Sequence, residues 1–209
     1  MRALVFLLAL LPLLGVSQQT PTDTMAVPYF GGMDLRDGVY LSPASFRANR
    51  PDVPLADLRD DQGLPVLDIR TVVSKLYWQA DTGGTKALRM NAMWGFCQND
   101  VVYIQAGNGF YRIGLMGSLA HMVYQQSYID WDPYFYGSVS RTVLVQQMVD
   151  IERGAVLPFN ATRMLQALQA DPILLEEFQN LPKKHRNSTE VLFRFLRTYN
   201  QRHPLYFVP

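Results

Sequence analysis

Residues 91–126 constrain the fold most, because this stretch consists of short apolar runs separated by tight-turn sequences. Asn108-Gly109 lies between two runs rich in β-branched and aromatic residues, and an Asn-Gly pair tolerates the positive φ angles of a type I′ hairpin turn. Gln98-Asn99-Asp100 and Gly117-Ser118 mark two further turns. Three successive turns predict four consecutive antiparallel strands.

The chain on either side of this stretch predicts further strands. Those expected on β-branched, aromatic or alternating patterns cover residues 37–41, 66–80, 139–152 and 155–157. Ser42 followed by Pro43 is the start signal of a short helix over residues 43–49. The aromatic segment 127–137 is expected to be a loop.

After residue 158 the apolar residues follow a helical period, which predicts three helices. Asn160 is expected to cap the first helix, and Asp171-Pro172 starts the second. Asn187 with Glu190 matches a capping box for the third, which Pro204 ends. The apolar residues 205–208 are expected to dock back on the sheet.

The predicted fold class is therefore α+β: an antiparallel meander sheet or partial barrel of about seven to nine strands, followed by a C-terminal three-helix segment. Residues 29–209 are expected to form a single domain, mainly β sheet over 29–158 and helices over 159–209. Residues 18–28 show no apolar period and are expected to be a flexible leader.

The N-terminus has the three regions of a secretory signal peptide over residues 1–17. Arg2 is followed by an apolar run of about 12 residues, shorter than the roughly 20 that a membrane-spanning helix needs. Cleavage is expected after Ser17. The chain is therefore expected to be exported, as a periplasmic or secreted protein without a transmembrane segment.

Charge and cysteine content exclude several function classes. The 19 Lys and Arg residues nearly balance the 18 Asp and Glu residues, and no dense basic run indicates nucleic-acid binding. Residues 183–186 form one basic cluster, expected to be a solvated linker, with attachment to an anionic partner or membrane as the alternative. Cys97 is the single cysteine, so no intramolecular disulfide can form.

Short motifs along most of the chain carry a family resemblance. They are Asp37-Gly38-Val39-Tyr40-Leu41-Ser42 with Phe46, Trp94-Gly95-Phe96-Cys97 before Val102-Tyr103-Ile104, Asp171-Pro172 before Glu176-Glu177-Phe178, and Tyr199-Asn200-Gln201-Arg202-His203-Pro204. Together they resemble an uncharacterised family of small secreted proteins from Bacteroidota. That family has no assigned activity, so the resemblance implies export but no catalytic residue.

Cys97 and His121 are the candidate catalytic residues, because a cysteine with a histidine base can form a thiolate nucleophile. Both lie in expected strands, where they could meet across the sheet. The competing interpretation is that Cys97 is a small buried hydrophobe, since free cysteine is among the most buried residue types.

No metal site and no cofactor are expected. His121, His185 and His203 are far apart in the sequence, without metal-ligand spacing. Asp130 and Asp132 flank Trp131 and could supply two calcium ligands or a glycosidase carboxylate pair. The plainer interpretation is a turn solvated by two acids.

The aromatic segment 124–136 is the strongest candidate binding site in the sequence. Trp131, Tyr134 and Tyr136, together with Trp94, could stack on sugar rings or cover an apolar ligand. Alternatively, the aromatic residues hold their own loop against the sheet.

Three functions remain open on the sequence alone. The leading one is an exported non-catalytic protein that binds a cell-envelope partner or a small apolar or sugar ligand. The second is an exported hydrolase built on Cys97 and His121. The third is a structural envelope component that docks through its last helix, with Phe193 on an exposed apolar stripe. The oligomeric state is left open.

Overall fold

The computed structural model describes residues 25–79, 83–134 and 136–208. The predicted signal peptide, its cleavage point and most of the leader lie outside these residues. The strands are β1 Val27–Pro28, β2 Gly38–Tyr40, β3 Val53–Pro54, β4 Leu58–Arg59, β5 Leu76–Gln79, β6 Thr85–Leu88, β7 Gly95–Gln98, β8 Val101–Ala106, β9 Gly109–Leu115, β10 Leu119–Asp132, β11 Gly137–Asp150, β12 Ala155–Pro158 and β13 Tyr206–Phe207. The α-helices are α1 Pro43–Arg47, α2 Ile69–Val72, α3 Ala161–Ala167, α4 Pro172–Asn180, α5 Lys183–Arg186 and α6 Thr189–Arg202, and the 3-10 turns are η1 Leu55–Asp57, η2 Val73–Lys75, η3 Met90–Ala92 and η4 Leu168–Ala170.

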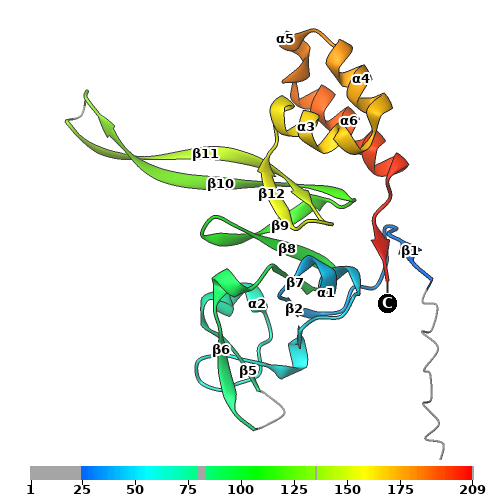
Figure 1. The fold of residues 1–209 in the computed structure, drawn as a ribbon. Helices are drawn as coiled ribbons and strands as arrows, with labels where there is room; N and C mark the ends of the chain where they lie inside the picture. Colours follow the sequence, from blue (N-terminus) through cyan, green and yellow to red (C-terminus); the bar gives the residue numbers. More distant parts are fainter. Residues whose placement is uncertain (1–24, 80–82, 135, 209) are drawn as a thin grey trace, which may run out of the picture.

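The main sheet is antiparallel and has eight strands in the order β12-β11-β10-β9-β8-β7-β2-β3. From β7 to β12 each strand pairs with its successor, so this part is a meander, as predicted (Figure 1). The sheet is open and not closed into a partial barrel. With the helices that follow, this confirms the α+β class.

The predicted turns are found, but one has a different geometry. Asn99 and Asp100 both have positive φ, 52° and 59°, so the β7–β8 connection is the type I′ turn. In the β8–β9 hairpin Ala106 pairs with Gly109, which makes Gly107 and Asn108 the central residues. The type I′ assignment to Asn108-Gly109 is therefore wrong: of the two central residues Gly107 has positive φ and Asn108 does not, which is the pattern of a type II′ turn.

Two other segments differ from their predicted structure. Of the predicted strand region 66–80, the structure describes residues 66–79, and among these only Leu76–Gln79 is a strand. Ile69–Val72 is a helical turn capped by Asp68, whose carboxylate accepts from the Arg70 amide. Residues 127–132, expected in a loop, continue strand β10. Local β-branched and aromatic content did not distinguish these cases, because pairing partners decide them.

Three apolar clusters fill the interior. One face of the main sheet packs on α1 and on the chain ends around Phe46, Cys97, Met122 and Phe207. The opposite face, with Leu119 and Met148, packs on α3, α4 and α6. The third cluster lies between the β2–β7 region and the small sheet β4-β5-β6. The main sheet thus has α1 and the chain ends on one face, and the helical unit and the small sheet at separate places on the other.

The C-terminal helical unit contains four α-helices, α3 to α6, not three. The predicted linker over residues 183–186 is itself a helical turn, α5. Asn160 caps α3 as predicted, but Ser188, not Asn187, caps α6, because the Ser188 hydroxyl accepts from the Val191 amide. Among the described residues no helix is both long and apolar enough to span a membrane.

Two hydrogen bonds from one side chain of α6 fix the helical unit to the sheet. The Asn200 side chain on α6 donates to the Leu119 carbonyl at 2.8 Å and accepts from the Leu119 amide at 2.9 Å, so it pairs with the backbone of β10 as a neighbouring strand would.

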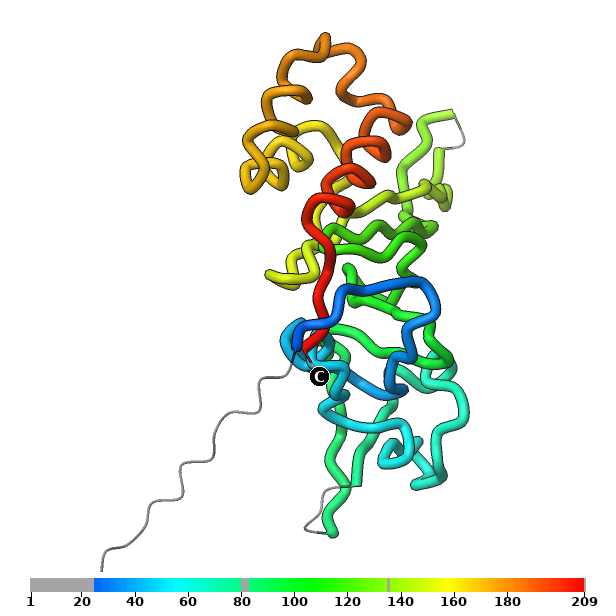
Figure 2. The backbone as a smooth tube through the Cα atoms, turned by 90° about the vertical axis from the view of Figure 1, so that its right-hand side faces the viewer, coloured from blue at the N-terminus to red at the C-terminus, as the bar shows by residue number. Residues whose placement is uncertain are grey.

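The chain end then returns beside the N-terminal strand, where β13 pairs with β1 (Figure 2). Residues 205–208 therefore dock on the body as expected, with Phe207 fully buried.

Candidate functional site

The longest hairpin of the fold, β10–β11, projects from the sheet as a two-stranded ribbon (Figure 1). β9 pairs with β10 at His121 and Met122, and β12 pairs with β11 from Gln147 to Asp150, so both neighbours stop at the root. Eight further residue pairs, from Gln125↔Leu144 to Asp132↔Gly137, extend beyond them. We call residues 125–144 the arm. At about 3.4 Å per residue it is roughly 27 Å long.

One face of the arm carries no ionisable side chain. Alternation along each strand and the pairing register place the following side chains on it: Val123 at the root, Gln125, Ser127, Ile129 and Trp131 from β10, and Ser138, Ser140, Thr142, Leu144 and Gln146 from β11. Ile129 is 78% exposed, Leu144 66% and Trp131 62%. This uncharged face continues the sheet face that the helical unit covers at Leu119 and Met148.

The opposite face of the arm is charged. Arg141 bridges Asp130 at 3.2 Å and Asp132 at 3.0 Å, and Asp132 also accepts from the Tyr134 amide. The two carboxylates therefore hold the strands together through one guanidinium, which explains them without calcium or glycosidase chemistry. No group of three or more His, Cys, Asp or Glu side chains with metal-site geometry occurs in residues 25–79, 83–134 and 136–208.

The structure brings together three of the four predicted ligand-contacting aromatics. Trp131 lies on the uncharged face near the tip, and Tyr134 and Tyr136 at the tip are almost fully exposed. Phe135 lies outside the described residues. Trp94 is elsewhere, half-buried in the body with its ring 5.2 Å from that of Phe46. Tyr124, at the root, stacks on Tyr111 at 3.6 Å and braces the other face.

Cys97 and His121 do not meet. Cys97 lies on β7 and His121 on β10, three strands apart, which is about 14 Å at roughly 4.8 Å per strand. They also face opposite sides of the sheet: Cys97 joins the cluster of Met122, whereas His121 contacts Phe159 and Phe193 under the helices. The arrangement needed for a Cys-His nucleophile pair is absent from these two residues.

The thiol of Cys97 is fully buried, and this burial, with Asp37 and Asp100 nearby, raises its pKa to about 12. We expect native Cys97 to resist alkylation by iodoacetamide at pH 8 and to react at the rate of a free thiol once the chain is unfolded in urea. Mass spectrometry of the quenched protein measures this. Rapid labelling of the native protein would contradict a buried structural role.

His121 is buried between Phe159 and Phe193, with ring centroids 4.6 Å from each, and its Nε2 lies 3.3 Å from Oε1 of Gln146. Burial lowers the pKa of His121, and the contact with Gln146 offsets only part of this. The imidazole is thus held neutral against apolar rings.

A depressed folded pKa makes stability depend on pH. Below the ordinary value of 6.5 the unfolded chain binds a proton at His121 that the folded chain does not, so the free energy of unfolding falls as the pH drops from 6.5 toward the folded pKa. We expect His121→Gln to flatten this part of the urea-unfolding profile between about pH 5 and 7. His185→Gln, at an exposed position, is the control and keeps the slope. An unchanged slope in His121→Gln would refute this assignment.

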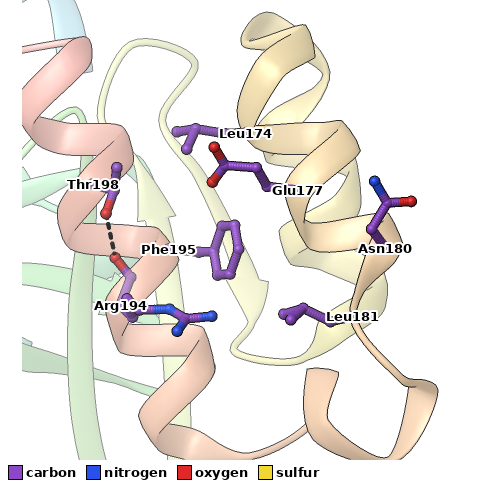
Figure 3. Close-up of a pocket in the computed structure, with 7 residues that line it drawn as sticks. All are labelled: Leu174, Glu177, Asn180, Leu181, Arg194, Phe195 and Thr198. Atoms are coloured by element: carbon purple, nitrogen blue, oxygen red, sulfur yellow. Dashed lines mark hydrogen bonds between the residues drawn. The ribbon is translucent and has the colours of Figure 1, made fainter.

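A second candidate site, which the sequence did not indicate, is the groove between α4 and α6 (Figure 3). Its cavity of about 510 Å³ is lined by Leu174, Glu177, Asn180, Leu181, Arg194, Phe195 and Thr198. Leu174 and Phe195 at its floor are already buried, and the Arg194 guanidinium lies 5.2 Å from the Phe195 ring centre. Phe193, expected on an outer stripe of α6, instead packs toward the sheet on His121 and Phe159.

Asp171 is the most deeply buried carboxylate of the helical unit. It caps α4 by accepting from the Leu174 amide, and it accepts from Arg202 and lies 3.0 Å from Nε2 of His203. Burial acts to raise its pKa, but these hydrogen bonds outweigh burial and lower it to about 2. His203 thus stands at the C-terminal end of α6, and its imidazole ties that end to the start of α4 through Asp171.

The arm is therefore the main candidate site, and a small-ligand site in the sheet interior is not formed by the predicted aromatics. The resemblance to a secreted Bacteroidota family stays a prediction, and the motifs that carry it lie mostly in the body of the fold. In comparison with known proteins, the chain matches no family model, no curated protein and no solved structure.

Proposed function

We propose that the protein is an exported, non-catalytic binding protein that holds a protein partner along the uncharged face of its arm. The observation that carries this proposal is the row of large apolar side chains, Ile129, Trp131 and Leu144, that the fold leaves exposed on a charge-free surface. Large apolar side chains left exposed together on one face mark interaction sites in soluble proteins.

The energetics favour the arm over the groove between α4 and α6. Leu174 and Phe195 in the groove are already buried, so a partner there removes little further apolar surface from water. Each large apolar side chain of the arm, by contrast, contributes about 1.5–3 kcal/mol when it is fully covered. A free two-stranded ribbon is also only marginally stable in water, which favours a partner that covers it.

The arm favours a protein over a sugar or another small ligand as the partner. Trp131, Tyr134 and Tyr136 are 62%, 91% and 85% exposed on a two-stranded ribbon, whereas small-molecule sites are concave and enclose most of their ligand. The unpaired outer edges of β10 and β11 beyond the root add backbone groups that a protein strand can also pair with.

The experiment is site-specific photo-crosslinking in the exporting cell. A photoreactive phenylalanine analogue replaces Ile129 on the uncharged face or, in the matched control, Tyr128 on the charged face, which is also exposed. We expect covalent protein adducts from position 129 and few from position 128. Equal labelling from both positions, or none from 129, would refute the proposal. Unchanged near-ultraviolet circular dichroism verifies that both variants are folded.

A further inference from the structure

The geometry points to a second copy of this chain as the occupant of the uncharged face, with the two arms packed face to face and antiparallel. This inference rests on the proposed function and names its partner. A face without ionisable groups can lie against itself, because no like charges oppose each other and no charge has to be buried. A twofold pair needs such a self-complementary surface.

The helical unit decides the relative direction of the two arms. It covers the same sheet face at the root, where Phe159 and Phe193 lie over His121, and the face is free from Val123 outward (Figure 1). If the arms ran parallel, the sheet of the second copy would have to occupy the place of these helices. Antiparallel arms limit this overlap to the tips, because only the residues beyond Trp131 reach the level of the helical unit of the other copy.

The order of large and small side chains along the uncharged face fits an antiparallel pair centred on Ser127 and Thr142, whose hydroxyl oxygens are 2.9 Å apart. With the twofold axis across the strands at this level, β10 lies over β10 and β11 over β11 of the second copy. Leu144 then meets Ser140 of the second copy, and Ile129 meets Gln125. Trp131 meets Val123. Each large side chain is thus placed over a smaller or flexible one, as interdigitating sheets require.

The contact area indicates a weak pair. A face of roughly 27 Å by about 10 Å is about a third of the roughly 800 Å² per partner that stable complexes bury. The tips add to this, because Tyr134 and Tyr136 of each copy reach the level of His121 in the other, beside its helical unit. The contact area of the faces and tips together is that of a weak complex, whose dimer fraction depends on the protein concentration.

The first test is sedimentation of the purified exported protein over a wide concentration range. We expect a reversible shift from one to two chains in the micromolar range. Leu144→Lys places two charges in the contact and should weaken the association at least 100-fold. Val143→Lys, at the neighbouring exposed position on the charged face, should change it less than threefold.

The second test examines the register by charge pairing. A Leu144→Lys chain mixed with a Ser140→Glu chain should form a mixed pair, because the introduced lysine of one chain then faces the introduced glutamate of the other, while the symmetry-related contact keeps its native leucine and serine. Mixing Leu144→Lys with Ser138→Glu should not restore pairing. Equal restoration by both mixtures would overturn the antiparallel register.

The outcomes separate this inference from the proposed function. A protein that stays monomeric at all concentrations, yet forms position-129 adducts with a different protein in cells, overturns the second-copy assignment and leaves the binding arm intact. Adducts of twice the chain mass from position 129 support the assignment. Absence of both self-association and adducts overturns both proposals.

Discussion

Replacing Asn200 by alanine is expected to lower the free energy of unfolding by about 2–6 kcal/mol, because two backbone groups of buried Leu119 lose their hydrogen-bond partner and each unsatisfied group costs about 1–3 kcal/mol. The Ser118 hydroxyl also lies 3.0 Å from this Asn200 oxygen, but its single proton has the His203 carbonyl at 2.6 Å as an acceptor, so it keeps a partner in the variant. Equilibrium unfolding in urea measures the change. The slope of the free energy against urea concentration should be the same in both proteins if unfolding is two-state.

Two further variants locate the effect. Gln201→Ala, one position along α6 and exposed, should change stability by less than about 0.5 kcal/mol. Gly117→Ala should disturb the same hydrogen bonds from the sheet side, since a methyl group at Gly117 would stand 2.3 Å from the Asn200 amide nitrogen and displace it. Equal stability of Asn200→Ala and Gln201→Ala would show that the hydrogen bonds between Asn200 and Leu119 do not hold the helical unit to the sheet.

Replacing Phe207 by alanine is expected to cost about 3–5 kcal/mol, the usual range for a fully buried phenylalanine. The Phe207 ring packs edge-on against Phe46 with centroids 5.2 Å apart and lies 6.1 Å from Tyr29. The substitution therefore opens a cavity where α1, the N-terminal strand and the chain end meet. Urea unfolding followed by tryptophan fluorescence is suitable, because Trp94 contacts Phe46.

Tyr206→Ala is the matched control for Phe207→Ala, since Tyr206 lies on the same short strand with its side chain turned toward solvent. We expect it to cost less than about 1 kcal/mol. If both substitutions had the same small effect, the chain end would not belong to the stabilising core of the body.

The sequence predicted the meander because its turns depend on local chemistry. Asn99 and Asp100 adopt positive φ whatever strands they join, and Ser42 and Asn160 cap helices through their own side chains. Ser188 caps α6 in place of the predicted Asn187. Both side chains can accept a hydrogen bond at a helix N-terminus, so tertiary packing decides which of the two neighbours is the cap. The Asn187 oxygen instead accepts from the Ala161 amide on α3.

The candidate site was predicted in its residues but not in its form. Trp131, Tyr134 and Tyr136 were selected as exposed aromatics, yet the segment before the tip was expected to be a loop, because Asp130, Asp132 and Pro133 have turn chemistry. The alternation of residues 129–132 is too short to outweigh these turn signals. The uncharged face could not be seen in either strand alone. It depends on the register that sets Ile129 opposite Ser140 and Leu144 opposite Gln125.

The pairing of β1 with β13 has a consequence for the order of folding. Val27 and Phe207 stand at opposite ends of the described chain, so their contact closes a loop that contains nearly every other element. Hairpins and helices form from near neighbours in microseconds, whereas this closure must wait until β13 has been synthesised. The hairpins and the helical unit can therefore form first, and the end-to-end closure completes the fold.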